Sequence, residues 1–377
     1  MAEGTRDVPY QAEWTPNLRH RPDPNRVNGP AAPARTIAPA RRPTLPEAPY
    51  PQPTTTSPQP SYYDLSILKA PVWKWQIASY FFCGGLSAGA YALSRMAERA
   101  GDEKYRDLSR MGAYLALAAL IPCPPLLIAD LGDPKRFHHM LRVWKPGTPM
   151  NLGTWSIVAY SGMATYEVVR QYLQDRSDRI GSAQRGRLLK LMNNGVLLAM
   201  HDAAGVPFAL MVAGYTGVLL SCTSNPLWCK NPWLGPLFSA SALSTGAEAI
   251  SLALDCTAEG GQPQSPSHSI LRKVDTLAHL TEIGCLAGFL RFAGDKARPL
   301  RQGSQSKYHH LSLRAMIAAE LLKLVPFGGA LHKPIRMLSS ALGLAAGFAL
   351  RWSMVHSGRD AAEDPHAARL VSQPREG

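Results

Sequence analysis

The sequence predicts an all-α integral membrane protein with about eight transmembrane helices, arranged as two four-helix bundles behind a disordered N-terminal tail. Three observations support this fold class. Several segments of about 20 residues, the length that crosses a bilayer, are apolar and nearly free of charge. Lys and Arg gather between these segments. The first 60 or so residues are rich in Pro, Arg, Ala and Thr, with too few large apolar side chains to form a core.

The overall composition agrees with this interpretation once it is read segment by segment. Hydrophobic residues make up 46% of the 377 residues and charged residues 18%, averages that combine a polar tail with very apolar segments. The formal net charge of +13 is also typical of nucleic-acid-binding proteins. Here the cations flank apolar segments, where they face anionic headgroups. We therefore expect a multi-pass protein of the cell inner (cytoplasmic) membrane that contacts the lipid bilayer and no nucleic acid.

The chain divides into a disordered Pro/Arg-rich tail (1–70), a transmembrane domain (71–357) and a polar C-terminal tail (358–377). The basic loops after the first and third expected helices favour a cytoplasmic position for both, which places the turn after the second helix on the outer side. The expected helices are 75–96, 108–129, 153–173, 196–221, 234–254, 274–292, 313–331 and 335–355.

The first expected helix, 75–96, enters the membrane after an aromatic anchor formed by Trp73 and Trp75. It carries a face of small residues on which another helix can pack closely, because backbone proximity drives helix association in lipid. These small residues are Gly84, Gly85, Ser87, Ala88 and Gly89.

The second expected helix, 108–129, contains Pro122, Pro124 and Pro125 near its end. Prolines remove backbone donors and kink or unwind a helix. Such a break is tolerated at membrane depth only where protein or a cavity covers the freed carbonyls. The sequence therefore predicts a pocket beside Asp130, the last acid of this segment.

The turn that follows holds an acid and two cations at one membrane surface. Gly132 and Pro134 stop the helix, and Lys135 and Arg136 cannot enter lipid. By spacing alone, Asp130 only caps the turn and the cations anchor the helix end; the other interpretation is that they form a functional site.

The remaining helices follow from hydropathy. His201, Asp202 and Pro207 interrupt the segment 196–221, whose start is therefore the least defined. The last four expected helices, from 234 to 355, are assigned on their apolar lengths alone.

Four motifs resemble the membrane subunit of the NrfD / polysulfide reductase family. They follow one another in order from about Pro71 to Leu254, whereas the later helices match only in hydropathy. The motifs are Trp73–Trp75 leading into Tyr80–Gly89, the turn Asp130–Phe137, the segment Thr148–Trp155, and Gly214–Leu220 with Asn225–Trp228.

The resemblance implies a quinone-reactive integral membrane subunit of an oxidoreductase. Its cofactor would be menaquinone or ubiquinone. Its partners would be a ferredoxin-like iron–sulfur subunit and a catalytic subunit of a kind that often carries molybdopterin. The six cysteines include no Cys-x-x-Cys pair, so we expect no iron–sulfur cluster and no metal site in this protein. The pairs of His on facing helices that hold a haem are missing too, so we expect no haem.

Matched by motif, Tyr80 and Tyr215 fall at positions resembling quinone-contacting ones, and Asp130 resembles the acidic proton exchanger. Family members with His in place of Tyr80 bind the quinone head through imidazole, so the phenol is a departure. Without the resemblance, both tyrosines are equally well explained as interfacial belt residues. Trp73 and Trp155, with Trp75, are expected to form walls, and Lys135 and Arg136 to dock the partner or shape the turn.

Ionisable residues inside the expected helices each cost about 3 kcal/mol to insert, so each needs a reason. For any one of them, a structural pair between helices and a proton carrier are equally good interpretations. The spacing of three residues predicts pairs between His279 and Glu282 and between Glu320 and Lys323. As a set they predict a proton route, formed by Glu167, His201, Asp202, Glu248, Asp255, His279, Glu282 and Glu320, with Asp275 and Lys323 nearby.

Two other functions stay open at the level of sequence. One is a haem-b-type membrane anchor, in which His201 and His279 ligate iron. The other is an ion- or proton-translocating transporter without a redox role, which uses the buried acids.

Overall fold

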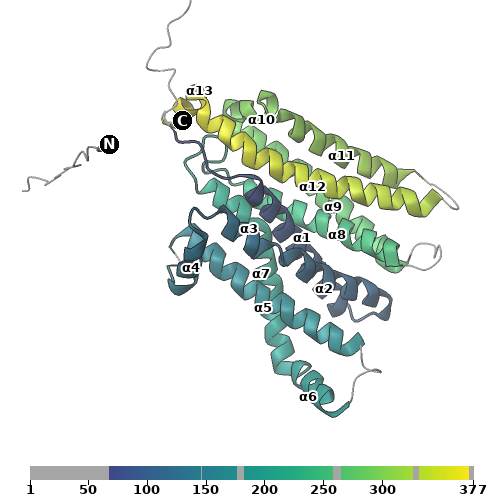
Figure 1. The fold of residues 1–377 in the computed structure, drawn as a ribbon. Coiled ribbons are helices and arrows are strands. Elements are labelled where there is room, and N and C mark those ends of the chain that lie inside the picture. Colours follow the sequence, from purple (N-terminus) through teal and green to yellow (C-terminus); the bar gives the residue numbers. More distant parts are fainter. Residues whose placement is uncertain (1–67, 146, 176–181, 258–264, 326–330, 373–377) are drawn as a thin grey trace, which may run out of the picture. The chain divides into compact units, whose positions relative to one another are not determined.

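The computed structural model describes residues 68–145, 147–175, 182–257, 265–325 and 331–372. Within these ranges the protein is built of α-helices and short 3-10 turns, without a strand (Figure 1), and the predicted all-α class is confirmed. All of them belong to one unit, Gln59–Gly377. Apart from residues 68–70, the predicted disordered tail lies outside the described residues.

Each of the eight expected segments overlaps a helix, and the segment 108–129 overlaps two, α2 and α3. Four helical stretches in the described residues are long and apolar enough to cross a membrane, namely Glu103–Asp130, Gly195–Ser221, Leu234–Thr257 and His332–Glu363. The long helices are α1 (Trp75–Arg99), α2 (Arg106–Leu120) with α3 (Cys123–Asp130), α5 (Pro149–Asp175), α7 (Gly195–Ser221), α8 (Leu234–Thr257), α9 (Pro266–Ala293), α11 (Ser306–Leu324) and α12 (His332–Glu363).

Short elements connect or follow these helices. They are η2 (Glu103–Tyr105), η3 (Pro134–Arg136), α4 (His138–Arg142), α6 (Ser182–Met192), η4 (Gly294–Ala297), α10 (Arg298–Gln302) and α13 (Pro365–Ser372).

Helix α1 lies at the centre of the packing, against α2, α7, α8 and α12 (Figure 1). The predicted small-residue face allows this. A side chain at Gly89 would place its Cβ 1.9 Å from the carbonyl oxygen of Ala242, so only glycine permits this approach of α1 to α8. Further along, α8 packs on α9 and α12, and α11 packs on α12.

The predicted proline break is present between α2 and α3. Helix α2 ends at Leu120, and α3 begins at Cys123 with Pro122 as its N-cap. Pro124 and Pro125 occupy the first turn of α3, where a missing backbone donor costs least. The break therefore redirects the chain just before Asp130, which is the last residue of α3.

Several helix ends differ from the predicted ones. Helix α9 begins at Pro266 because the Ser265 side chain accepts a hydrogen bond from the backbone of His268, a capping signal that hydropathy overlooks. Helix α11 ends at Leu324, two residues before Pro326. Helix α12 continues to Glu363, so part of the predicted polar C-terminal tail is helical, and Ala361 and Ala362 are buried.

The fourth motif ties the end of α12 to the segment between α7 and α8. Asn225 donates a hydrogen bond to the carbonyl of Gly358 (2.6 Å), and Trp228 donates one to the carbonyl of Met354 (3.1 Å). Trp228 is almost wholly buried, so its ring forms part of the core on which the residues before α1 rest.

Candidate functional site

A cavity of about 260 Å³ lies among α1, α3, α4, α5 and α7. Its walls are mainly apolar side chains such as Ile77, Leu127 and Ile157, and a few polar groups reach it. Small-molecule sites in proteins have this character and typically occupy about 300–1,000 Å³. The predicted pocket beside the proline break is therefore present, and the polar side chains that line it are Tyr80, Asp130, Thr154, Ser161 and Tyr215.

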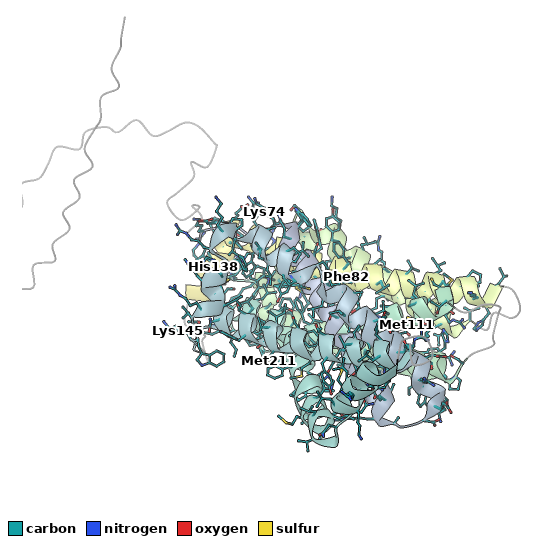
Figure 2. All side chains as sticks on the ribbon, turned by 60° about the horizontal axis from the view of Figure 1, so that its bottom comes forward. Lys74, Phe82, Met111, His138, Lys145 and Met211 are labelled. Carbon is teal, nitrogen blue, oxygen red and sulfur yellow. The ribbon has the colours of Figure 1, made fainter. Side chains whose placement is uncertain are left out.

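Asp130 lines this cavity as a half-buried residue at the C-terminal end of α3. Its carboxylate faces the backbone N–H of Lys74, which precedes α1. Lys74, His138 and Lys145 lie towards one end of the described helices and Met111 towards the other (Figure 2). The acid is thus placed between an apolar cavity and a cationic end of the protein.

Tyr80 projects from α1 into the cavity wall and is 6% exposed. Within the described ranges, no hydrogen-bond partner is found for its hydroxyl group. A hydroxyl that faces a cavity, with no partner among the described residues, can bind a polar atom of a ligand.

Tyr215 reaches the same cavity from α7 and is held in place by α5. Its hydroxyl donates a hydrogen bond to the carbonyl of Pro149, in the first turn of α5. Its ring lies beside Gly153, where a Cβ would be 2.2 Å from Cε1 of the ring. The third motif therefore supplies both the acceptor and the space that Tyr215 needs.

Of the three tryptophans predicted to form walls, one lines the cavity and two do not. Trp73 lines the cavity and stacks on Trp228, with ring centroids 5.6 Å apart. The prediction that Trp155 forms a wall is wrong. Its neighbour Thr154 lines the cavity, and successive side chains on a helix point about 100° apart. Trp155 therefore points away from the cavity. It packs on Trp144 and donates a hydrogen bond to the carbonyl of Val143 (3.2 Å). Trp75 is 53% exposed and does not line the cavity either.

Lys135 and Arg136 lie on the surface in η3. The Asp133 side chain accepts from the backbone of Lys135 (3.2 Å) and pairs with Arg136 (3.0 Å). Asp133, not Asp130, therefore caps this turn. The capping interpretation of Asp130 is not supported, and both cations are accessible to a partner.

The residues of the predicted proton route fall into two clusters and one pair. In the first cluster, between α1, α5 and α7, Glu167 is bound by Arg95 (2.8 Å) and by Arg170 (2.7 Å). Asp202 also pairs with Arg95. Neither arginine is among the predicted residues, although Arg170 follows Glu167 at a spacing of three residues, which favours pairing on a helix.

A line of hydroxyl and imidazole groups leads from this cluster towards the cavity. His201 Nε2 lies 3.0 Å from the hydroxyl of Tyr91, whose ring packs edge-on against Tyr160. The hydroxyl of Tyr160 is 2.8 Å from Ser87 Oγ. Ile157 and Ser161, on either side of Tyr160 in α5, line the cavity.

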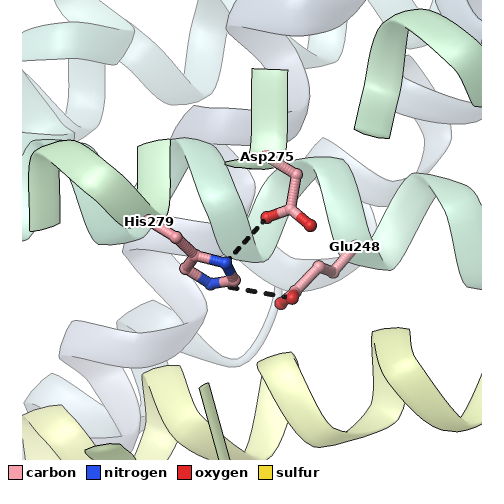
Figure 3. A group of neighbouring side chains, drawn as sticks. All are labelled: Glu248, Asp275 and His279. Carbon is pink, nitrogen blue, oxygen red and sulfur yellow. Dashed lines mark ion pairs between the residues drawn. The ribbon is translucent and has the colours of Figure 1, made fainter. Parts of the chain in front are cut away.

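The second cluster lies between α8, α9 and α11. Glu248, Asp275 and His279 face one another there (Figure 3), and Glu320 and Lys323 join them from α11. The predicted Glu320–Lys323 pair is confirmed at 2.7 Å. His279 and Glu282 lie close enough to attract each other, as their spacing predicts. The hydrogen bond of His279 goes to Glu320, and Glu282 accepts one from Ser244 (3.4 Å).

Asp255 forms a separate ion pair at the end of α8. Both carboxylate oxygens accept from Arg336 Nε (3.0 and 2.8 Å), and His268 Nε2 lies 3.2 Å away. A bidentate ion pair of this kind links α8 to α12, and this structural role explains why Asp255 is buried.

His201 and His279 belong to different clusters. His201 bonds to Tyr91 of α1, and His279 bonds to Glu320 of α11. A bis-histidine haem requires two imidazoles that face one iron. The two histidines do not form such a pair.

Comparison with known proteins adds independent information. The family model described as polysulphide reductase, NrfD, matches residues 66–360. One chain of the polysulfide reductase of Wolinella succinogenes is 30% identical over 179 residues, which cover 46% of this protein and 56% of that one. One subunit of the selenate reductase of Mesobacillus selenatarsenatis is 26% identical over 235 residues, 55% of this protein and 53% of that one.

A further match is protein NrfD of Escherichia coli, which is 26% identical over 260 residues, 66% of this protein and 76% of that one. The sequence spans little more than half the length of the polysulfide and selenate reductase relatives.

Proposed function

The chain belongs to the polysulphide reductase, NrfD, family, and from that premise we propose that it is the quinone-reactive membrane subunit of a multi-subunit oxidoreductase. It is a multi-pass membrane protein. The observation that carries the proposal is the apolar cavity in which Tyr80, Asp130 and Tyr215 meet. Two tyrosines and a carboxylate at an apolar cavity are the groups that a quinone head requires.

We further propose that all eight long helices span the membrane. Helices α1, α5, α9 and α11 are 25, 27, 28 and 19 residues long, and about 20 residues suffice to cross. Their lower apolar content comes partly from buried ionisable residues that pair with one another, such as Arg95 with Glu167. Paired charges inside a bundle are compatible with a span because they do not face lipid.

The residues of the cavity fit a quinone, which when bound accepts or releases two electrons and two protons. Apolar side chains such as Ile77 and Leu127 suit its ring and tail. The Tyr80 hydroxyl is free to donate a hydrogen bond to a carbonyl. The Tyr215 hydroxyl already donates to Pro149, so it offers its lone pairs as an acceptor for a quinol hydroxyl.

In this proposal Asp130 exchanges protons between the cavity and the surface. It lines the apolar space and lies at the end of α3, next to the exposed turn. The backbone N–H of Lys74 lies near its carboxylate and favours its charged form. A general acid or base must lie within hydrogen-bond reach of its proton, and a residue at the mouth of the cavity satisfies that condition for a head group beside Tyr80.

A second proton connection would run from the Arg95–Glu167–Asp202 cluster through His201 to Tyr91. Tyr91 meets Tyr160 only through a ring contact, so a bound water would have to join their two hydroxyl groups. Hydroxyl groups can accept and donate at once, so they relay protons without carrying charge. The cluster that contains Glu248 lies between α8, α9 and α11, whereas the cavity lies among α1, α3, α4, α5 and α7. We therefore leave it out of the proposed route.

Electrons would come from partner subunits. The names of the polysulfide and selenate reductase relatives describe one chain or one subunit of a reductase, which supports membership of a complex with other subunits. We propose that a ferredoxin-like iron–sulfur subunit docks at η3, where Lys135 and Arg136 are exposed, and that a catalytic subunit of the molybdopterin-carrying kind binds behind it.

Photoaffinity labelling of membranes with an azidoquinone tests this site. We expect labelled peptides from residues 73–81, 124–141, 150–161 and 215–219, and loss of the label when excess menaquinone or ubiquinone is added. Replacing Ile157 by Trp fills the cavity and should remove the label, whereas Val169→Trp, on the exposed face of the same helix, should keep it. Labelling of other segments alone, or labelling that Ile157→Trp leaves unchanged, would refute the proposed site.

A further inference from the structure

Three side chains of the second cluster converge on one small space. Glu248 of α8 and Asp275 and His279 of α9 offer ligand atoms that all lie within 4.8 Å of one another (Figure 3). Each residue is 3% exposed or less. Carboxylate oxygen and imidazole nitrogen are the ligand types that bind divalent first-row metals.

His279 is oriented in the way that metal-binding histidines are. Its Nδ1 lies 2.6 Å from Glu320 Oε1, so in the neutral ring Nδ1–H donates to that carboxylate and the lone pair is on Nε2. A carboxylate behind a histidine fixes the ring and raises its basicity as a ligand.

The distance between His279 and Glu248 is that expected for two ligands of one metal ion. His279 Nε2 and Glu248 Oε1 are 3.7 Å apart, beyond hydrogen-bond distance. Two ligands that each bind one ion at about 2.1 Å, at an angle a little wider than tetrahedral, have this separation.

The carboxylate of Glu248 is not satisfied by the protein. In the residues that the structure describes, both of its oxygens are buried without a hydrogen-bond partner, and so is Oδ1 of Asp275. Its nearest cations, His279 when protonated and Lys323, are 3.7 and 3.8 Å from Oε1, too far for a hydrogen bond. Burying a carboxylate without hydrogen bonds is costly, so a ligand or a proton must complete the site. The carboxylate is seated against α12 at Gly343, where a Cβ would lie 1.5 Å from Oε1.

The charges of the cluster leave room for one divalent ion. When ionised, Glu248, Asp275 and Glu320 carry three negative charges, and Lys323 supplies one positive charge. The charge of nearby Glu282 is offset by that of Arg351. Lys323 bonds to Asp275 and to Glu320 (2.7 Å) but stays 3.8 Å from Glu248 Oε1. It leaves Asp275 Oδ1 unpartnered. Two negative charges thus remain, which is the amount that one divalent ion neutralises.

A route to this space exists. A second cavity, of about 310 Å³, is lined by Glu248, Asp275 and Lys323 and also by Arg272, which is exposed on the surface. Arg336, another residue of its wall, is neutralised by Asp255. The cavity therefore joins the buried cluster to the outside.

We propose that Glu248, Asp275 and His279 bind one divalent metal ion of the Zn²⁺ class, with Glu320 as the residue that orients His279. The site lies between α8, α9 and α11 and shares no side chain with the quinone cavity. It is therefore independent of the proposed function. It also departs from the sequence expectation of no metal site, because Glu248 and His279 belong to different helices and form no recognisable spacing.

Zinc binding by the full-length protein, purified in detergent with its partner subunits and stripped with a chelator, tests the site. Equilibrium dialysis against Zn²⁺ with elemental analysis should reveal one saturable ion that Glu248→Gln and His279→Gln abolish. Glu320→Gln should weaken binding by roughly tenfold or more, as loss of a supporting carboxylate does. Glu363→Gln, an exposed acid of α12 that pairs with Arg359 outside the cluster, should bind normally.

Two controls separate this site from other sources of zinc binding and from misfolding. Because His138 and His139 are adjacent on the surface, the double variant His138→Ala/His139→Ala must keep the ion. Zn²⁺ should raise the thermal unfolding midpoint of the unmodified protein and of Glu363→Gln, since binding stabilises the native state. Absence of saturable binding in the unmodified protein, or binding that survives Glu248→Gln, overturns the proposal. The carboxylates of the cluster would then be neutralised by bound protons and not by a metal ion.

Discussion

The ring of Tyr215 occupies the space that a side chain at Gly153 would need. A Cβ at position 153 would lie 2.2 Å from Cε1 of that ring, and the hydroxyl of Tyr215 donates to the carbonyl of Pro149 one turn earlier. The glycine of α5 and the tyrosine of α7 thus fit each other, and together they form one wall of the cavity.

Gly153→Ala should therefore displace Tyr215. Overpacking of this kind costs roughly 1–3 kcal/mol, and we expect both a lower unfolding midpoint and a raised KM for quinol in the assembled complex. Gly162→Ala, on the same helix with open space around it, should not lower stability, because alanine favours helix. Equal effects of the two substitutions would show that the Tyr215 contact is unimportant.

Asp130→Asn should abolish most quinone-linked electron transfer while leaving the complex assembled. Removal of a general acid or base typically slows a reaction by about 100- to 10,000-fold. The measurement is quinol oxidation or quinone reduction by the purified complex. Asp133→Asn, in the same turn but engaged with Arg136, should retain activity. Normal turnover in Asp130→Asn would remove this residue from the mechanism.

Tyr80→Phe should raise the KM for the quinone substrate with little effect on folding. Loss of one hydrogen bond to a bound carbonyl corresponds to about 0.5–1.5 kcal/mol, or up to roughly tenfold in affinity. Tyr114→Phe removes a hydroxyl that donates to Asp175 (2.8 Å) and leaves the cavity intact. Steady-state kinetics of both variants measure the KM for quinone. An unchanged KM in Tyr80→Phe counts against a hydrogen bond between the Tyr80 hydroxyl and the quinone.

Arg136→Ala should reduce co-purification of the iron–sulfur subunit, because its guanidinium is 73% exposed on the proposed docking turn. Arg110→Ala provides the matched control, since the Arg110 side chain is 50% exposed and likewise pairs with an aspartate, Asp175, at 2.8 Å. Affinity purification from membranes, with both proteins quantified, measures the effect. Recovery of the partner at the normal ratio would place the docking surface elsewhere.

Arg95→Met should destabilise the protein by about 3–5 kcal/mol, because it leaves the carboxylate of Glu167 buried without its main cation from α1. Arg99→Met, one turn later and about half exposed, should change stability by less than about 0.5 kcal/mol. Unfolding in detergent, followed by circular dichroism, compares the two. Similar midpoints would indicate that Arg170 alone satisfies Glu167.

The sequence by itself determined the helical membrane class, the proline break before Asp130 and the neighbourhood of Tyr80, Asp130 and Tyr215. These features are local or belong to motifs, since apolar length, proline and ordered motif residues can be read along one sequence. The buried acids could be found in the same way, because each interrupts an apolar segment.

Only the tertiary structure decided which of these residues meet. A side chain's partner on another helix depends on how each helix is rotated about its axis and shifted along it, and one residue changes that direction by about 100°. For this reason Trp155 turns away from the cavity although Thr154 faces it. For the same reason the acids form two clusters, one around Arg95 and one around Lys323.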